Sequence, residues 1–125
     1  MREHHLPRLL KITGWITMLP LLQFLAPSVV LSAGNMQAGD DAGLFFARHW
    51  GIIVLCLGAL LVYAANRPEI RRAVMFAAAV EKIDLVVRVA MAWNNPALQG
   101  MRPAVIADTV MVILYASHLL RRLAA

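Results

Sequence analysis

The ionisable residues within residues 70–93 are the part of this sequence most able to do chemistry. This apolar segment carries Glu81, Lys82, Asp84 and Arg88 in its middle and second half. A charge at membrane depth costs at least ~2.5–3.5 kcal/mol on insertion scales. Four charges in one span therefore need partners, water or a ligand, and their presence predicts a polar site inside a membrane protein.

Helical geometry separates these four side chains. At about 100° per residue, Glu81, Asp84 and Arg88 share one sector of roughly 60° around a helix. Asp84 and Arg88 are four residues apart, so they can form an ion pair within the helix. Lys82 points away from them, and its neighbours one turn along the helix are apolar. We therefore expect Lys82 to pair with another helix, to reach an interface, or to lose its proton.

Two other apolar segments contribute polar residues at a similar depth. Arg48 and His49 lie early in residues 43–65, and Asp108 lies early in residues 103–120. With the charges of the segment described above, they form a neutral set from three helices, as expected of an intramembrane polar site. An Arg48–Asp108 pair is one expected contact. Such pairs could also serve only to hold the helices in register.

The residue types predict a division of roles within this set. Glu81 would donate or accept a proton, and Asp84 and Asp108 would be the accompanying catalytic carboxylates. Isomerisation or cyclisation of an apolar molecule fits such a set, because it needs proton transfer and no redox cofactor. We expect no cofactor and no metal. The expected ligand-binding residues are Arg48, His49, Lys82, Arg88 and Trp93.

The composition places these residues in a membrane protein. Of the 125 residues, 61% are hydrophobic, which exceeds the ~45–50% of a typical soluble domain. A spanning helix needs roughly 20 mainly apolar residues, and four segments meet this length. We therefore predict an all-α integral membrane four-helix bundle that forms a single transmembrane domain over residues 1–125. The expected spans are residues 12–33, 43–65, 70–93 and 103–120.

Basic residues predict the orientation of the bundle. They cluster before the first span, between the second and third spans, and after the fourth, for example Lys11, Arg71 and Arg121. The positive-inside rule then places both termini in the cytoplasm, and we expect a bacterial inner (plasma) membrane. Attraction to anionic lipid headgroups explains the net charge of +5. We therefore expect membrane lipid as a partner and no nucleic acid.

Several classes of function are disfavoured by missing motifs. The single cysteine, Cys56, allows neither an intramolecular disulfide nor a CxxC redox relay, which argues against thiol–quinone chemistry. The sequence contains no HExxH motif, Gly-rich phosphate loop or nucleophile elbow. Small residues on the second and third spans let a neighbouring helix approach closely and permit a homodimer. They are Gly51, Gly58, Ala73 and Ala77.

Residues 43–93 also resemble a known group of membrane proteins. The sequence GLFFARHWG at residues 43–51, the later LGALLVYAA, Arg67-Pro68 and Arg71-Arg72 carry the likeness. In these positions the chain resembles small four-helix membrane proteins of the broad DoxX-like group. The resemblance implies the same four-helix architecture, and some members of that group are linked to quinone-coupled oxidoreductases.

Three functions are compatible with these observations. The first is an intramembrane pocket for an apolar or amphipathic small molecule, such as a lipid, isoprenoid, sterol or quinone, with or without an acid–base isomerase or cyclase activity. The second is a non-catalytic accessory or assembly subunit, in which the charges bind a partner protein. The third is a small proton-coupled transporter that uses Glu81 as its carboxylate.

Overall fold

The computed structural model describes residues 3–124, and every regular element in this range is a helix, which agrees with the predicted all-α class. Of the domain predicted over residues 1–125, only residues 1, 2 and 125 lie outside this description. The elements are η1 (Glu3–His5), α1 (Leu6–Thr17), α2 (Leu21–Leu25), α3 (Pro27–Ala33), α4 (Asp41–Ala64), α5 (Pro68–Met91), η2 (Pro96–Met101) and α6 (Arg102–Ala124).

Two helical stretches are long and apolar enough to cross a membrane. They are α4 and the stretch Pro96–Arg121, and Leu6–Leu25 with α3 makes a third if this bent pair is one span. α5 has the same 24-residue length as α4, but its charged side chains leave it outside this group. Large apolar side chains such as Leu19, Phe45 and Ile113 are exposed on the surface. These features are consistent with an integral membrane protein.

The first predicted span is broken at its prolines, as their positions indicate. α1 ends before Pro20, and the helical axis turns by 113° between the stretch ending at Leu25 and α3. Proline has no amide hydrogen, and it disfavours helical geometry in the residue before it. Ala26, which precedes Pro27, accordingly has non-helical angles of φ −143° and ψ 70°. The segment therefore folds back on itself.

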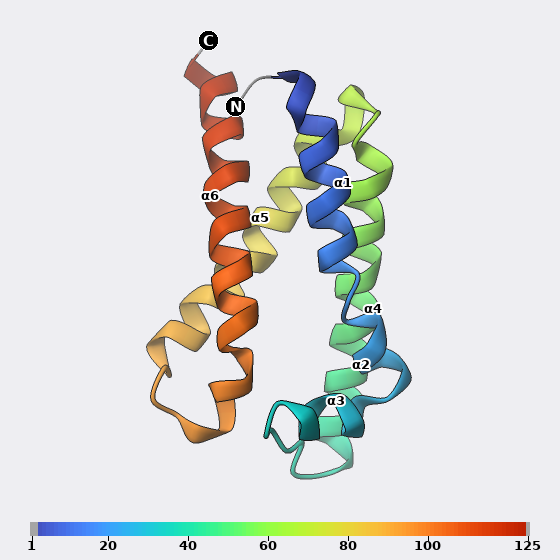
Figure 1. The fold of residues 1–125 in the computed structure, drawn as a ribbon, viewed down its shortest axis with the longest axis vertical. Helices are drawn as coiled ribbons and strands as arrows, with labels where there is room; N and C mark the ends of the chain where they lie inside the picture. The colour runs from blue at the N-terminus through green and yellow to red at the C-terminus, as the bar shows by residue number, and fades with distance from the viewer. Residues whose placement is uncertain (1–2, 125) are drawn as a thin grey trace.

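The chain forms two helical hairpins, and the turn between α4 and α5 connects the first hairpin to the second. α1 and α2 pack along α4, while α5 packs along α6 (Figure 1). Glycines allow the first contact, because a Cβ on Gly58 would lie 2.6 Å from the carbonyl oxygen of Gly14. A Cβ on Gly51 would lie 2.8 Å from the carbonyl oxygen of Pro20. The two glycines expected to permit a homodimer are thus covered within the chain.

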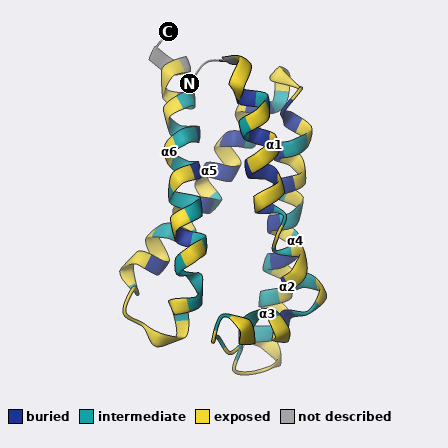
Figure 2. Cartoon of the chain, in the orientation of Figure 1, coloured by how far each residue is buried: buried dark blue, intermediate teal, exposed yellow. Residues whose placement is uncertain are grey.

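The hydrophobic core lies at the end of the molecule that carries η1 and the last turns of α6. It joins both hairpins through Leu10, Leu61, Met75 and Tyr115, all fully buried. Figure 2 shows the buried residues of α1 and α5 gathered toward this end. At the opposite end, near α3 and η2, the hairpins lie apart (Figure 1). The core therefore joins the two hairpins at one end of the molecule.

Candidate functional site

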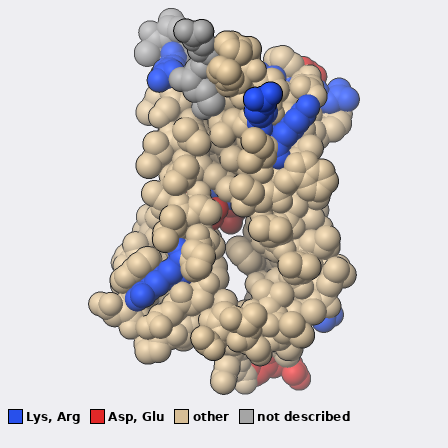
Figure 3. All heavy atoms as spheres, in the orientation of Figure 1, with Lys and Arg blue, Asp and Glu red and all other residues tan. Residues whose placement is uncertain are grey.

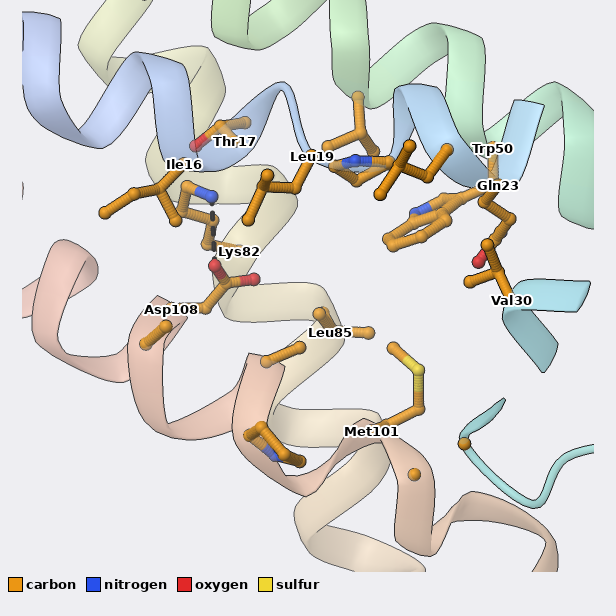
Figure 4. A pocket seen from close by; sticks show the side chains of 18 of the residues that line it. Ile16, Thr17, Leu19, Gln23, Val30, Trp50, Lys82, Leu85, Met101 and Asp108 are labelled. Atoms are coloured by element: carbon orange, nitrogen blue, oxygen red, sulfur yellow. Dashed lines mark hydrogen bonds and ion pairs between the residues drawn. The ribbon is translucent and has the colours of Figure 1, made fainter. Parts of the chain in front are cut away.

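A cavity of about 460 Å³ lies between the two hairpins. Most of its wall is apolar, with Leu19 from the α1–α2 turn, Trp50 from α4, Leu85 from α5 and Met101 from η2 (Figure 4). Figure 3 shows the molecule hollowed in this region, with atoms of acidic residues at one edge of the hollow. The volume and the apolar wall are those of a small-molecule site.

Lys82 and Asp108 form an ion pair at one side of this cavity. The Nζ atom of Lys82 donates a hydrogen bond to Oδ1 of Asp108 over 3.0 Å. The Lys82 side chain is 2% exposed and that of Asp108 is 13% exposed. The pair joins α5 to α6 (Figure 4), so of the three outcomes expected for Lys82 the structure shows the first, a pair with another helix. Charges this deeply buried need such a partner.

Glu81 lines the same cavity next to this pair. Its side chain is half-buried, and its Oε2 atom is buried without a hydrogen-bond partner among the described residues. The cavity thus holds two carboxyl groups, on Glu81 and Asp108, and one amine, on Lys82. One carboxyl oxygen therefore remains able to accept a hydrogen bond from a bound molecule.

Asp84 and Arg88 form the predicted ion pair but lie outside the cavity. The Nε atom of Arg88 donates to Oδ1 of Asp84 over 2.8 Å, and the side chains are 77% and 61% exposed. They lie on the outer face of α5, whereas Lys82 on the opposite face is buried. Glu81 lies at one edge of the helix sector that it shares with Asp84 and Arg88, and of these three residues only Glu81 lines the cavity. The charged residues of α5 were expected to form one cluster, and the structure divides them into two groups.

The structure does not bring Arg48 and His49 to the cavity. Arg48 is exposed and lines a different hollow with residues of α3 and with Asp41 and Phe45. His49 is also exposed, and its ring stacks on that of Phe45 with centroids 6.1 Å apart. The predicted Arg48–Asp108 pair is wrong. α4 turns Trp50 toward the cavity, and a residue two positions earlier projects to the other side of a helix.

Trp93 likewise lies outside the cavity, just beyond the end of α5. The guanidinium of Arg102 lies 4.5 Å from the centre of the Trp93 ring, and its Nη2 donates to the Trp93 carbonyl oxygen over 2.8 Å. These contacts fasten the connection between α5 and α6 on an exposed surface. The structure thus gives Trp93 a role in holding this connection.

The sequence analysis singled out neither Gln23 nor Trp50. Gln23 is 8% exposed, lines the cavity, and donates from Nε2 to the Ala47 carbonyl oxygen over 2.7 Å. Figure 4 shows Gln23 and Trp50 together at the side of the cavity opposite Lys82. A lone glutamine in the otherwise apolar residues 18–27 was the available signal. Its amide carbonyl gives the cavity a second polar region.

A row of buried hydroxyl groups continues from the cavity toward the core. Thr17 lines the cavity and donates to the Thr13 carbonyl oxygen over 2.7 Å. Thr13 donates to the Leu9 carbonyl oxygen over 2.8 Å, and its hydroxyl also bonds that of Tyr115. Both threonine protons therefore point to carbonyl groups of their own helix. The row holds α6 against α1 and does not form a continuous path for protons.

Two glycines bring the connecting segments together at the end of the cavity near α3. Gly34 and Gly100 both line the cavity, and a Cβ added to Gly100 would collide with the Gly34 carbonyl oxygen. Gly34 follows α3, and Gly100 belongs to η2. The contact therefore closes the space between the hairpins where their helices lie apart.

Comparisons of the chain with models of known protein families, with curated proteins and with solved structures found no match. Among the described side chains, those of residues 4–121, no group of three or more histidine, cysteine, aspartate or glutamate residues is placed to hold a metal ion. Fold and site together define a class: an all-helical protein with candidate membrane spans and a mostly apolar cavity between its hairpins that holds charged groups.

Proposed function

We propose that this chain is a four-helix membrane bundle, with both termini cytoplasmic, that binds an amphipathic small molecule between its hairpins. In this arrangement α5 crosses the membrane with its charged residues turned into the cavity or toward a neighbouring protein. The observation that carries the proposal is the position of Glu81 and the Lys82–Asp108 pair in one largely apolar cavity. Such cavities bind molecules whose apolar body fills the space and whose few polar groups fix the orientation.

The polar groups favour a ligand that donates a hydrogen bond. Oε2 of Glu81 is buried and has no hydrogen-bond donor among the residues that the structure describes, whereas the ammonium of Lys82 already has Asp108. With all three groups ionised, the cavity carries one net negative charge. A hydroxyl or amino group would satisfy Glu81, and a carboxylate or phosphate would be repelled. We therefore propose a long-chain, isoprenoid or sterol-like molecule with a hydroxyl or amino group.

Glu81 is also the group best placed for acid–base chemistry on such a ligand. It is the one cavity carboxyl group without an ion-pair partner among the described residues. Proton transfer to and from the bound molecule would support an isomerisation or a cyclisation without any change in redox state. Binding is the primary proposal, and this reaction is its extension.

Trp50 provides a direct probe of binding, because its side chain lines the cavity. Trp15 and Trp93, which are exposed, are replaced by phenylalanine so that Trp50 is the sole tryptophan. Quenching of its fluorescence is then measured in detergent with a nitroxide-labelled long-chain alcohol and with the matching carboxylic acid. We expect saturable quenching by the alcohol and weaker quenching by the acid.

Two variants make this measurement specific. Loss of a hydrogen bond to a charged group costs about 1.5–3 kcal/mol, so Glu81→Gln should weaken alcohol binding by about tenfold or more. Asp84→Asn is the matched control, because Asp84 lies on the exposed face of α5, and it should leave binding unchanged. Quenching that does not saturate, or that is equal for alcohol and acid and insensitive to Glu81→Gln, would exclude the proposed site.

A further inference from the structure

The outward face of α5 has the residue spacing of a helix-pairing seam. Its residues recur at alternating intervals of four and three positions, which is the pattern of a left-handed helix pair. All of them are exposed: Ala73, Ala77, Val80, Asp84, Val87 and Met91. We call this set the α5 stripe. The opposite face of α5, which includes Met75, Lys82 and Val89, is buried within the chain.

The ion pair between Asp84 of this stripe and the adjacent Arg88 needs a cover at membrane depth. Asp84 and Arg88 are 61% and 77% exposed. An arginine near a helix end can extend its side chain to the membrane surface. Here the hydrogen bond to Asp84 draws the Arg88 guanidinium back toward the middle of α5, away from Met91 at the helix end. Two charges held in this position are costly against lipid and favourable against a complementary polar surface.

We propose that the α5 stripe is the interface of a homodimer, in which two α5 helices lie parallel about a two-fold axis. A two-fold interface places the same patch on both copies, so the patch must complement itself. The Asp84–Arg88 pair meets this requirement, because each copy presents one negative and one positive group. Asp84 of each copy can then accept from Arg88 of the other, and the four charges sum to zero.

The remaining residues of the α5 stripe suit close helix contact. Ala73 and Ala77 are small and one turn apart, which lets two backbones approach. The other small residues considered for this purpose, Gly51 and Gly58, are already covered by α1 and α2. The inference depends on the proposed membrane position of α5 and is independent of the ligand.

Disulfide cross-linking in membranes tests the geometry. Cys56, which is exposed on α4, is first replaced by serine. Val80→Cys then places one thiol on the α5 stripe, and Ile113→Cys places a control thiol on the exposed face of α6, where Ile113 is 59% exposed. With copper phenanthroline as oxidant, we expect Val80→Cys to give a dimer and Ile113→Cys to remain monomeric. Absence of a Val80→Cys dimer, equal dimer from both, or cross-linking to a different protein would overturn the proposal.

Charge reversal tests the role of the ion pair. Asp84→Lys gives copies whose two groups are both positive, and Arg88→Glu gives copies whose two groups are both negative. For each variant alone, the dimer fraction in bilayers should be at least ten-fold lower than for the unchanged protein, because like charges meet at the axis. Single-molecule photobleaching measures this fraction. Mixed in equal amounts under two fluorescent labels, the variants should form mixed dimers. Homodimers of either variant at the normal level, or no mixed dimers, would contradict the inference.

The two proposals fail in different ways. Unchanged alcohol binding to Trp50 with no cross-linking at Val80 would remove the dimer and leave the cavity function intact. Cross-linking at Val80 without saturable quenching would keep the dimer and remove the ligand.

Discussion

Lys82 and Asp108 face each other across the contact between α5 and α6, with Nζ 3.0 Å from Oδ1. The pair has two consequences, because it joins the two helices of one hairpin and gives the cavity its polar side. The Asp108 side chain is only 13% exposed, so water can replace little of what Lys82 supplies. The same contact therefore stabilises the hairpin and supplies charged groups to the cavity.

Removing one partner of this pair should destabilise the fold more than removing both. Lys82→Met leaves the Asp108 carboxylate without its donor, and breaking a buried pair in this way typically costs ~3–5 kcal/mol. The double variant Lys82→Met/Asp108→Leu replaces both charges by apolar groups and should recover most of that loss. Unfolding in mixed detergent, followed by circular dichroism, gives the free energies.

Lys11→Met is the control for loss of a lysine charge, because Lys11 is exposed on α1. It should change the free energy of unfolding by less than about 0.5 kcal/mol. A double variant as unstable as Lys82→Met would show that the ion pair itself, rather than the unpaired carboxylate, determines stability.

Tyr115 should contribute mainly through its ring. The residue is fully buried in the core, and its hydroxyl bonds that of Thr13. Tyr115→Phe removes one hydrogen bond and leaves the Thr13 proton on the Leu9 carbonyl, so the loss should be about 1 kcal/mol. Tyr115→Ala opens a cavity and should cost ~3–5 kcal/mol. Thermal unfolding of the two variants distinguishes these contributions, and equal losses would contradict the assignment to the ring.

The length of the apolar segments was enough to predict the helical class, and local spacing was enough to predict one part of the site. The Asp84–Arg88 pair follows from their separation of four residues. A pair between Lys82 and another helix was one of three expected outcomes, because the residues three and four positions from Lys82 on its own helix are not acidic. A further local effect, the break of the first span at Pro20 and Pro27, follows from the missing amide hydrogen of proline. These features depend on interactions within one helix, which the sequence specifies directly.

The positions that sequence analysis misplaced depend on how one helix is rotated against another. Arg48 and Trp50 are two residues apart, so a rotation of α4 decides which of them lines the cavity. The contact of Gly51 and Gly58 with α1 and α2 sets that rotation, and it turns Trp50 inward. Trp93 was expected to bind ligand, but Arg102 holds it against the α5–α6 connection. Neither contact follows from spacing along a single helix.

The close contact between α1 and α4 should not tolerate a side chain at Gly58. A Cβ there would lie 2.6 Å from the Gly14 carbonyl oxygen, which belongs to a helix backbone and cannot turn aside. Gly58→Val should therefore cost about 3 kcal/mol, at the upper end for overpacking. Ala59→Val, at the next and exposed position, is the control and should have little effect. Equal free energies of unfolding for the two variants would mean that α1 and α4 can move apart without a loss of stability.

The contact between Gly34 and Gly100 should control access to the cavity. Ala at position 100 would collide with the Gly34 carbonyl oxygen, so Gly100→Ala must move η2 away from the segment after α3. Access is measured with Ala104→Cys in a Cys56→Ser background, because Ala104 lines the cavity. A water-soluble maleimide should then label this thiol about tenfold faster, which corresponds to about 1.4 kcal/mol. Ala97→Ser, at an exposed position of η2, should leave the rate unchanged. An unchanged rate in Gly100→Ala would mean that the cavity opens elsewhere, between the helices and toward the lipid.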